Sequence, residues 1–319
     1  MQVTAIVVTF NRAKELERCI RAVMKQSYKI QNLVIVNNAS TDNTLDTLKD
    51  IFETDISTSL NRTIFVREIN DIKVYIYNFS ENTGGSGGFS KGMEIANSEL
   101  NSDYFWMMDD DGYPTSECLN ILMKYIDTYE YVMPVSINID KRTELSWPVR
   151  KKNGVKTVLY KELRDNWGNI MNFVTPFNGV LLSRKCVNDV GYINKNFFIW
   201  GDEYEHWWRC KEKNINPVTI MDSLFFHPAA KLPLVPICFG LFKVPYVDSE
   251  LRMCCLARNY TYIYLHHDRK FKIVIKYLMY FWLYIITRKF DLKGWKLYKA
   301  SVRDAYNNDF TRHLQFLKK

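Results

Sequence analysis

The segment Tyr104-Phe105-Trp106-Met107-Met108-Asp109-Asp110-Asp111-Gly112 decides the fold class. Five aromatic or apolar residues in a row before a turn are typical of a strand that is buried on both faces. Ionised carboxylates in an apolar interior are costly unless a cation meets them. Three carboxylates at the end of this strand therefore indicate a divalent metal site. A solvated acidic turn that begins the next helix is the alternative interpretation.

Strands and helices alternate through the first 130 residues. Apolar runs predict strands at residues 3–10, 33–36, 62–66, 74–79 and 104–108. Amphipathic periodicity predicts a first helix that Asn11 caps and that ends at about residue 26. A second helix ends at about residue 52. A third begins in the glycine-rich segment at residues 82–92 and ends at about residue 97. This alternation predicts an α/β fold with a mostly parallel sheet flanked by helices. Ligands bind such sheets at the carboxyl ends of the strands.

Composition and charge narrow the class of protein. The 319 residues are 47% hydrophobic, enough for a large core. The seven cysteines form no CxxC pair, which favours reduced thiols. A core strand that begins at Val3 leaves no room for a signal peptide, so we expect a cytosolic location. Residues 243–319 carry sixteen Lys and Arg against six Asp and Glu. Without a nucleic-acid motif, this excess favours an anionic membrane surface over nucleic acid.

The segment NTGGSGGFSKG (82–92) holds four glycines in five positions before a predicted helix. Glycine lets backbone N–H groups approach an anion, and a helix N-terminus attracts one. A phosphate contact is one interpretation, and tight packing of the helix on a strand is the other. Neither a P-loop nor a dinucleotide-binding pattern is present.

A second acidic segment, FFIWGDEYEHWWR (197–209), combines carboxylates with aromatic residues. Asp202 and Glu205 have the spacing of a capping box, so helix capping accounts for both. Glu203 is not explained in this way. A carboxylate among aromatic residues is a candidate general base, although a favourable first-turn charge is the alternative. The tryptophans fit either a core or platforms for sugar rings.

The remaining segments give weaker signals. Residues 136–170 suggest a connecting hairpin with loops, residues 175–183 a turn into a strand, and residues 184–190 a short helix. His227 follows an apolar strand, as the carboxylates do. Residues 271–287 are strongly apolar, but their uninterrupted apolar run of ten residues is shorter than the ~20 that span a bilayer. An interfacial membrane helix or a buried core or oligomer helix remain as alternatives.

Taken together, these motifs resemble inverting glycosyltransferases of family 2, which have the GT-A fold. The matching segments are VTAIVVTFNR (3–12), VIVNNASTDNT (34–44), MDDDG (108–112), GDEYEHWWR (201–209) and His227. The resemblance covers roughly residues 3–230. The segment at 82–92 is especially similar to bacterial galactofuranosyltransferases, and rhamnosyltransferases have related motifs. Asn37 and Glu203 stand where aspartate is usual.

The resemblance implies roles for particular residues. The nucleotide-diphosphate sugar, with a UDP-sugar favoured, would contact Thr9, Phe10, Asn11, Arg12, Asn37, Asn38, Asp42, Asn82, Gly84, Gly85 and Asp110. Asp109, Asp111 and His227 would bind Mn²⁺ or Mg²⁺. Glu203 would be the catalytic base, with Asp202 beside it. The acceptor would contact Trp200, Glu205, His206 and Trp207.

The implied activity is metal-dependent, inverting transfer of a sugar to a hydroxyl of a lipid-linked glycan in bacterial cell-surface polysaccharide synthesis. UDP-galactofuranose is the favoured donor and dTDP-rhamnose the alternative. A non-catalytic nucleotide-sugar or glycan-binding module is the alternative of another class. A nucleotidyltransferase would need a basic glycine-rich loop after the first strand, which residues 9–12 do not supply.

We expect two regions in the chain. Residues 1–242 would form the GT-A domain. Residues 243–319 would form a basic, aromatic-rich helical region that associates with a membrane or forms a homo-oligomer. The resemblance and the basic C-terminal region together predict a peripheral protein at the cytoplasmic face of the cell membrane.

Overall fold

The computed structural model describes residues 1–172, 178–229, 232–267 and 269–317, and the chain divides into two compact units. Unit 1 comprises Met1–Lys195 and His206–Ala230, and unit 2 comprises Asn196–Glu205 and Lys231–Lys319. Helix α8 (Asp202–Glu212) begins in unit 2 and ends in unit 1. The predicted boundary after residue 242 stays a prediction, because compact units do not have to fold independently.

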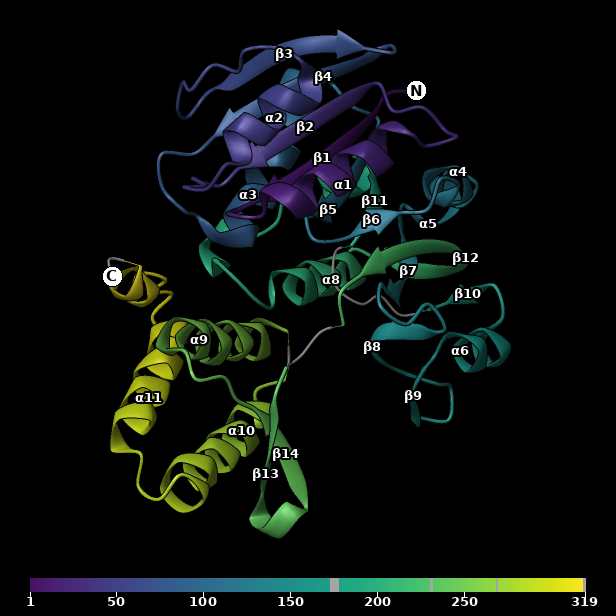
Figure 1. The fold of residues 1–319 in the computed structure, drawn as a ribbon. Coiled ribbons are helices and arrows are strands. Elements are labelled where there is room, and N and C mark those ends of the chain that lie inside the picture. The colour runs from purple at the N-terminus through teal and green to yellow at the C-terminus, as the bar shows by residue number, and fades with distance from the viewer. Residues whose placement is uncertain (173–177, 230–231, 268, 318–319) are drawn as a thin grey trace. The chain divides into compact units, whose positions relative to one another are not determined.

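Unit 1 is built on a sheet that has twelve strands in the described residues (Figure 1). The order along its main path is β10-β12-β7-β11-β5-β1-β2-β4-β3. The strands are β1 (Val3–Thr9), β2 (Asn32–Asn37), β3 (Thr63–Ile69), β4 (Ile72–Asn78), β5 (Tyr104–Asp109), β6 (Tyr113–Pro114), β7 (Tyr131–Asn138), β8 (Glu144–Arg150), β9 (Lys156–Leu159), β10 (Ile170–Met171), β11 (Val180–Ser183) and β12 (Val218–His227).

Helices cover both faces of this sheet. They are α1 (Ala13–Met24), α2 (Thr44–Phe52), α3 (Gly84–Glu94), η1 (Ile95–Glu99), α4 (Cys118–Met123), α5 (Ile126–Tyr129), α6 (Tyr160–Trp167) and α7 (Arg184–Val190). Along β1, Val3, Ala5 and Val7 pack with α1, α2 and α4 on one face. Ile6 and Val8 pack with α3 on the other. Because side chains alternate along a strand, both faces of β1 are apolar and buried.

The pairing confirms the predicted α/β fold with a mostly parallel sheet. Strands β4, β2, β1 and β5 are parallel neighbours. Strand β11 is antiparallel to both β5 and β7, and β12 is parallel to β7. Strand β12 therefore runs in the same direction as β5. The carboxyl ends of β1, β2, β4, β5 and β12 thus lie along one edge of the sheet.

Close packing explains most of the glycines in α3. A Cβ added at Gly88 would lie 2.4 Å from Cγ1 of Val8, and one at Gly92 would lie 2.3 Å from Cγ2 of Ile6. Gly87 is equally restricted by Thr83 of the same segment. At Gly85, in contrast, no described atom lies within 4 Å of the added Cβ. Tight packing on the sheet therefore accounts for Gly88 and Gly92. It does not account for Gly85, which faces open space and leaves room for the alternative interpretation, a phosphate contact.

Several local predictions need correction or extension. Asn11 does not cap α1, since the helix begins at Ala13 and the side chain of Asn11 accepts from the backbone N–H of Thr41 instead. The glycine-rich segment is helical from Gly84, not a loop before the helix. The predicted hairpin at 136–170 is formed by β7, β8 and β9, but it is followed by α6, which was not predicted. Of the predicted turn at 175–183, residues 175–177 lie outside the described residues.

Unit 2 combines a short hairpin with long helices (Figure 1). Its elements are η2 (Lys195–Phe197, from the end of unit 1), β13 (Leu234–Ile237), η3 (Cys238–Gly240), β14 (Phe242–Pro245), α9 (Glu250–His266), α10 (Phe271–Phe281), η4 (Trp282–Thr287), α11 (Leu292–Tyr306) and η5 (Arg312–Phe316). Its core is aromatic, with Tyr280 and Tyr298 stacked at 4.5 Å. The predicted helix at 271–287 is present as α10 and η4. Within the described residues, no helix has the length and apolar character needed to span a bilayer.

Substitution of Gly88 and Gly85 by alanine tests the packing of α3. We expect Gly88→Ala to lower the free energy of unfolding by about 1–3 kcal/mol, because the new methyl group overlaps Val8. Gly85→Ala should leave stability unchanged or raise it by up to about 1 kcal/mol, because alanine favours the helix. Urea unfolding of both variants measures the difference. Equal stabilities would contradict this account of the glycines.

Candidate active site

The polar edge of unit 1 is formed by strand ends that lie in register. Thr9 at the end of β1 pairs with Asn37 of β2, and Asn37 pairs with Asn78 of β4. On the other side of β1, Val8 pairs with Asp109 of β5. The turns that follow these strands therefore start at one level. The structure thus brings together the predicted residues at 9–12, 37–42 and 109–111.

Asp110 is the most enclosed of the three consecutive carboxylates, with 2% of its surface exposed. The Thr9 hydroxyl donates to its Oδ2 at 2.7 Å, and the Arg12 guanidinium donates to its Oδ1 at 3.0 Å. Burial raises the pKa of Asp110 to about 6, against the lowering effect of Arg12. Both oxygens are engaged within the protein, so Asp110 fixes Thr9 and Arg12. Its predicted contact with the sugar nucleotide stays a prediction.

Asp111 lies between the guanidinium of Arg12 and the imidazole of His227. Nη1 of Arg12 donates to its Oδ2 at 2.8 Å, and Nε2 of His227 lies 3.2 Å from its Oδ1. Burial favours the neutral acid, but His227 and Arg12 outweigh it and lower the pKa of Asp111. Oδ1 of Asp111 is buried, and Nε2 of His227 is a close neighbour that makes no regular hydrogen bond with it.

Asp109 is the carboxylate with the least compensation. No hydrogen bond reaches its carboxylate from the residues that the structure describes. Burial, followed by the charges of Asp111 and Asp110, raises the pKa of Asp109 to about 8. An oxygen ligand that is costly to ionise by itself is stabilised when a cation binds beside it.

The donor set fits a hard divalent cation. Asp109, Asp111 and His227 supply carboxylate oxygens and an imidazole nitrogen, which suit Mn²⁺ or Mg²⁺. Oδ1 of Asp111, which is buried without a regular hydrogen bond, supports this fit. In this structure, however, the side chains of Arg12 and His227 lie against the two oxygens of Asp111. Within the described residues, no group of three or more His, Cys, Asp or Glu side chains is arranged to hold a metal ion.

Neutral amide side chains hold the turns beside the carboxylates. Oδ1 of Asn11 accepts from the backbone N–H of Thr41 at 2.7 Å, which joins the turns after β1 and β2. Asn37 donates to Oδ1 of Asn78 at 3.0 Å. Oδ2 of Asp42 accepts from the N–H of Ala13 at 3.3 Å, at the start of α1. These predicted donor-binding residues shape the edge, whereas Phe10, which is 41% exposed, leaves its ring open to solvent.

The start of α3 is attached to the same edge through Asn38. Its Nδ2 donates to the Gly84 carbonyl at 2.9 Å, and its Oδ1 accepts from the N–H of Thr83 at 2.9 Å. Oδ1 of Asn82 in turn accepts from the N–H of Gly84 at 2.8 Å. Gly84 has a φ of 71°, a left-handed conformation that glycine adopts without strain. The open surface at Gly85 therefore lies at a helix N-terminus that is fixed to β2.

Glu203 belongs to unit 2, in the first turn of α8, and is partly exposed. The helix begins one residue earlier than a capping box requires, because the first helical hydrogen bond runs from the Glu205 N–H to the Gly201 carbonyl at 2.8 Å. Asp202 is thus the first helical residue and not the cap. This corrects the predicted capping arrangement and leaves both Asp202 and Glu203 in the first turn.

The backbone before α8 is strained and firmly held. Phe198 and Trp200 have φ values of 67° and 64°, which are uncommon for bulky residues. The fully buried Asn259 of α9 donates to the carbonyls of Phe197, Ile199 and Trp200 at 2.9, 2.9 and 2.7 Å. Strain of this kind persists only where surrounding groups enforce it, and it often marks functional sites.

The predicted acceptor contacts divide into exposed and buried residues. Trp200 and Trp207 are partly exposed. His206 is completely buried, with Nε2 at 3.2 Å from the Gly191 carbonyl, and its predicted contact with the acceptor stays a prediction. The acidic, aromatic sequence around His206 did not indicate that this side chain faces the core of unit 1. Glu205 is 5% exposed and is likewise enclosed.

Sequence reasoning missed residues that complete this edge. Nη2 of Arg18 donates to the Asp111 carbonyl at 3.2 Å, and its guanidinium lies over the Tyr113 ring. Asn78 also went unnoticed, although its place at the end of a predicted strand gave the same signal as Asn37. Arg18 gave only an ordinary helical pattern. Asn259 gave no signal, because its partners lie about sixty residues away in sequence.

Comparison with known families supplies independent information on this arrangement. Residues 4–191 match the model of glycosyl transferase family 2. The chain is 28% identical over 303 residues to the galactofuranosyltransferase GlfT1 of Mycolicibacterium smegmatis, with 92% of each chain covered. It is 26% identical over 300 residues to GlfT1 of Mycobacterium tuberculosis, with 92% of this chain and 91% of that protein covered.

Solved structures resemble the chain in fold. The mannosyltransferase PcManGT from Pyrobaculum calidifontis, in complex with GDP-Man and Mn²⁺, has a TM-score of 0.52 at 14% identity, covering 96% of this chain and 75% of that one. S. aureus TarS 1-349 in complex with UDP-GlcNAc has a TM-score of 0.52 at 15% identity, covering 98% and 89%. The predicted GT-A fold is confirmed.

Proposed function

The chain belongs to glycosyl transferase family 2 and is a glycosyltransferase, and we propose that it transfers galactofuranose from UDP-galactofuranose to a hydroxyl of a lipid-linked glycan. The product would serve bacterial cell-surface polysaccharide synthesis. The observation that carries the proposal is the extent of the similarity to GlfT1. The family model ends at residue 191, whereas the alignment with GlfT1 covers 92% of the chain and so includes much of unit 2.

The donor would bind at the polar edge of unit 1. Gly85, in the first turn of α3, has open space beside it, and a helix N-terminus favours phosphate oxygens. Asn38 would keep this helix end in place through its bonds to Thr83 and Gly84. Arg12 is 48% exposed in its side chain and carries a charge suited to the diphosphate.

Asp109, Asp111 and His227 would hold the divalent cation. When bound, the cation offsets the negative charge that develops on the departing nucleoside diphosphate. For these residues to take up that role, Arg12 and His227 would exchange their present contacts with Asp111. Asp110 would keep Arg12 and Thr9 in position throughout.

Glu203 would act as the general base. Its carboxylate takes the proton of the acceptor hydroxyl while that oxygen forms a bond to the anomeric carbon. The bond from the anomeric carbon to the diphosphate breaks, and its electron pair leaves with UDP. One displacement of this kind inverts the anomeric centre. Asn259 holds the strained segment before α8. A segment held in this way would keep Glu203 in a fixed position, as a catalytic base requires.

A mass-spectrometric donor screen tests the substrate and the metal together. The full chain is mixed with UDP-galactofuranose, dTDP-rhamnose and other nucleotide sugars on a lipid-like glycoside acceptor, with Mn²⁺ or with EDTA. We expect transfer from UDP-galactofuranose in Mn²⁺ and none in EDTA. Preferential use of dTDP-rhamnose would overturn the donor assignment. Metal-dependent nucleotide binding without consumption of any donor would instead favour a non-catalytic binding module.

Substitution of Glu203 by glutamine tests the base. We expect Glu203→Gln to lower transfer about a thousandfold, because the amide cannot accept the hydroxyl proton, while donor affinity stays unchanged. Glu212→Gln is the control, since Glu212 is an exposed carboxylate at the other end of the same helix. Steady-state transfer and donor titration measure both effects. Normal turnover in Glu203→Gln would contradict the assignment.

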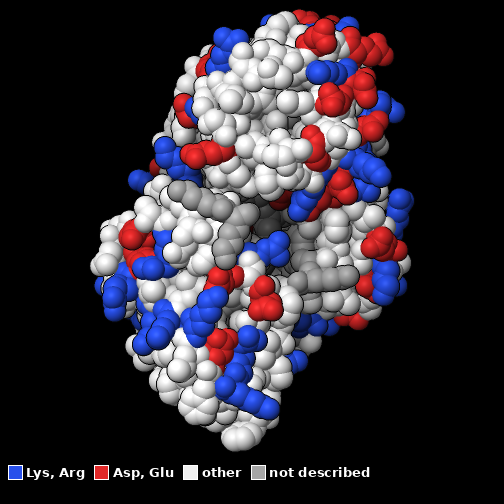
Figure 2. Space-filling view, turned by 60° about the vertical axis from the view of Figure 1, so that its left-hand side comes forward, with Lys and Arg blue, Asp and Glu red and all other residues white. Residues whose placement is uncertain are grey.

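We further propose that unit 2 binds an anionic membrane surface. Phe239 and Leu241 at the tip of the β13–β14 hairpin are 94% and 78% exposed. On α10, Val274 and Leu278 are both 62% exposed. Figure 2 shows blue Lys and Arg side chains interspersed with uncharged surface and with some red Asp and Glu side chains in the lower part of the view. Exposed apolar residues with basic neighbours are typical of interfacial binding to anionic lipid.

Vesicle sedimentation tests this surface. We expect the full chain to bind vesicles that contain phosphatidylglycerol, and the double variant Phe239→Ser/Leu278→Ser to bind at least about tenfold more weakly, because apolar contact area is lost. Phe65→Ser is the control, because Phe65 is 55% exposed on β3 of unit 1. A concentration-dependent dimer that the double variant abolishes, without vesicle binding by the wild type, would instead assign this surface to an oligomer.

A further inference from the structure

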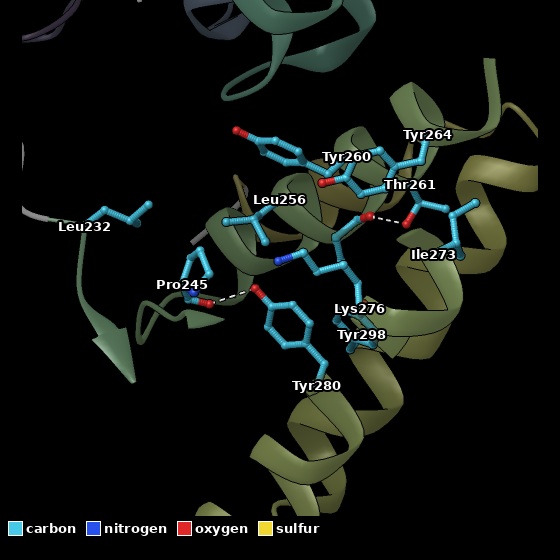
Figure 3. Close-up of a pocket in the computed structure, with 11 residues that line it drawn as sticks. Leu232, Pro245, Leu256, Tyr260, Thr261, Tyr264, Ile273, Lys276, Tyr280 and Tyr298 are labelled. Carbon is cyan, nitrogen blue, oxygen red and sulfur yellow. Dashed lines mark hydrogen bonds between the residues drawn. The ribbon is translucent and has the colours of Figure 1, made fainter. Parts of the chain in front are cut away.

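Unit 2 contains a pocket that the transfer reaction described above does not use (Figure 3). Its volume is about 160 Å³. Residues of α9, α10 and α11 line it, together with Pro245 of β14 and Leu232. Nine of the eleven lining residues are apolar or aromatic, and five of these are Leu256, Tyr260, Tyr264, Tyr280 and Tyr298. The other two members are Thr261 and Lys276.

Lys276 is unexpected because it lies on the inward face of α10. Val274 and Leu278 mark the outward face of this helix, and each is 62% exposed. Ile273 and Tyr280, three residues before and four after Lys276, are 7% and 3% exposed. Residues at this spacing share one face of a helix. Figure 3 shows the Lys276 side chain extending from α10 toward α9, near Leu256 and Tyr280.

The charge of Lys276 is not balanced by an acid. Burial, followed by the charge of Lys272, lowers the pKa of Lys276, and no carboxylate among the described residues contributes to its environment. Nearby hydroxyls are partly engaged elsewhere: Tyr280 donates to the Pro245 carbonyl at 2.8 Å and Thr261 to the Ala257 carbonyl at 2.7 Å. A partly buried ammonium without a counter-ion is costly, and an anion entering the pocket would compensate it.

The walls indicate that this anion carries an apolar chain. The side chains of Leu256, Ala257 and Ile273 offer no polar partners, so the part of the ligand that lies against them is better an alkyl chain than a sugar or a nucleotide. A cavity of about 150 Å³ accommodates a group of the size of benzene, so only the first part of a chain fits inside. Leu232, one of the lining residues, is 43% exposed, so the pocket has an apolar side chain that also meets solvent.

We propose that this pocket binds the head of a long-chain lipid phosphate, with the Lys276 ammonium paired with the phosphate and the aromatic wall in contact with the first carbons of the chain. The chemistry is that of an amphiphilic anion, in which charge and chain are recognised together. This inference rests on the proposed function only in identifying the ligand with the lipid anchor of the acceptor. The pocket itself is independent of the donor and of Glu203.

Binding of farnesyl phosphate to the full chain tests the pocket directly. Isothermal titration compares farnesyl phosphate, farnesol, inorganic phosphate and palmitate. We expect farnesyl phosphate to bind at least about tenfold more tightly than each of the others, because only this ligand combines phosphate and chain. Equal binding of inorganic phosphate would overturn the lipid assignment. Equal binding of palmitate would overturn the phosphate assignment, and equal binding of farnesol would remove the role of Lys276.

Substitutions in α10 test whether the charge of Lys276 contributes to binding without changing the fold. We expect Lys276→Met to weaken farnesyl phosphate binding about tenfold or more and to leave farnesol binding unchanged, while Lys276→Arg retains most of the affinity. Lys296→Met is the control, since Lys296 is an exposed lysine on α11 that lies outside the pocket lining. Wild-type affinity in Lys276→Met would contradict the proposal, provided that thermal unfolding shows both variants folded.

Transfer assays distinguish failure of this proposal from failure of the proposed function. With Lys276→Met, we expect a higher KM for a prenyl-phosphate-linked acceptor and an unchanged KM for a short alkyl glycoside without phosphate. If both acceptors are used equally by wild type and variant, the pocket assignment fails while the transferase activity stands. If farnesyl phosphate binds through Lys276 but no donor is consumed, the proposed function fails while the pocket stands.

Discussion

Three consecutive carboxylates at the end of a buried strand require positive charge nearby, and the edge of unit 1 is arranged around that requirement. Arg12 reaches Asp110 and Asp111 from the turn after β1, and His227 approaches Asp111 from the end of β12. These groups come from positions that are about a hundred residues apart in the chain. Only a sheet in which β1, β5 and β12 end at the same edge brings them together. An unpaired buried charge costs several kcal/mol, so the register of these strands and the chemistry of the site depend on each other.

Most of the positioning at this edge is done by neutral side chains. Asn11, Asn37 and Asn38 fix the turns and the start of α3 through amide hydrogen bonds. An amide satisfies backbone donors and acceptors without adding a charge. The local field is therefore determined mainly by the carboxylates and by Arg12, and a ligand that rearranges these charges need not disturb the scaffold. The packing of α3 on β1 serves the same end, since Gly88 and Gly92 bring the helix backbone close to the sheet.

Features that depend on residues near in sequence could be predicted, whereas features that depend on distant residues could not. The α/β fold and the gathering of residues 9–12, 37–42 and 109–111 at one edge were predictable, because strand periodicity is local and parallel strands end together. The burial of His206 and the three carbonyl contacts of Asn259 were not, because they depend on partners about fifteen and about sixty residues away in sequence. Lys276 illustrates the same limit. The apolar run of residues 271–287 was evident, but its inward-facing lysine became meaningful only once α9 and α11 were placed around it.

The division of the chain into units has a consequence for how such enzymes diversify. Residues 196–205 belong to unit 2, yet residues 206–230, which include β12 and His227, return to unit 1 before the chain enters unit 2 again. The two units are thus interleaved along the gene. A single recombination crossover near residue 230 would replace the helices while leaving behind residues 197–200, whose carbonyls Asn259 holds. Exchange of unit 2 between homologues would therefore require either paired crossovers or retention of this asparagine.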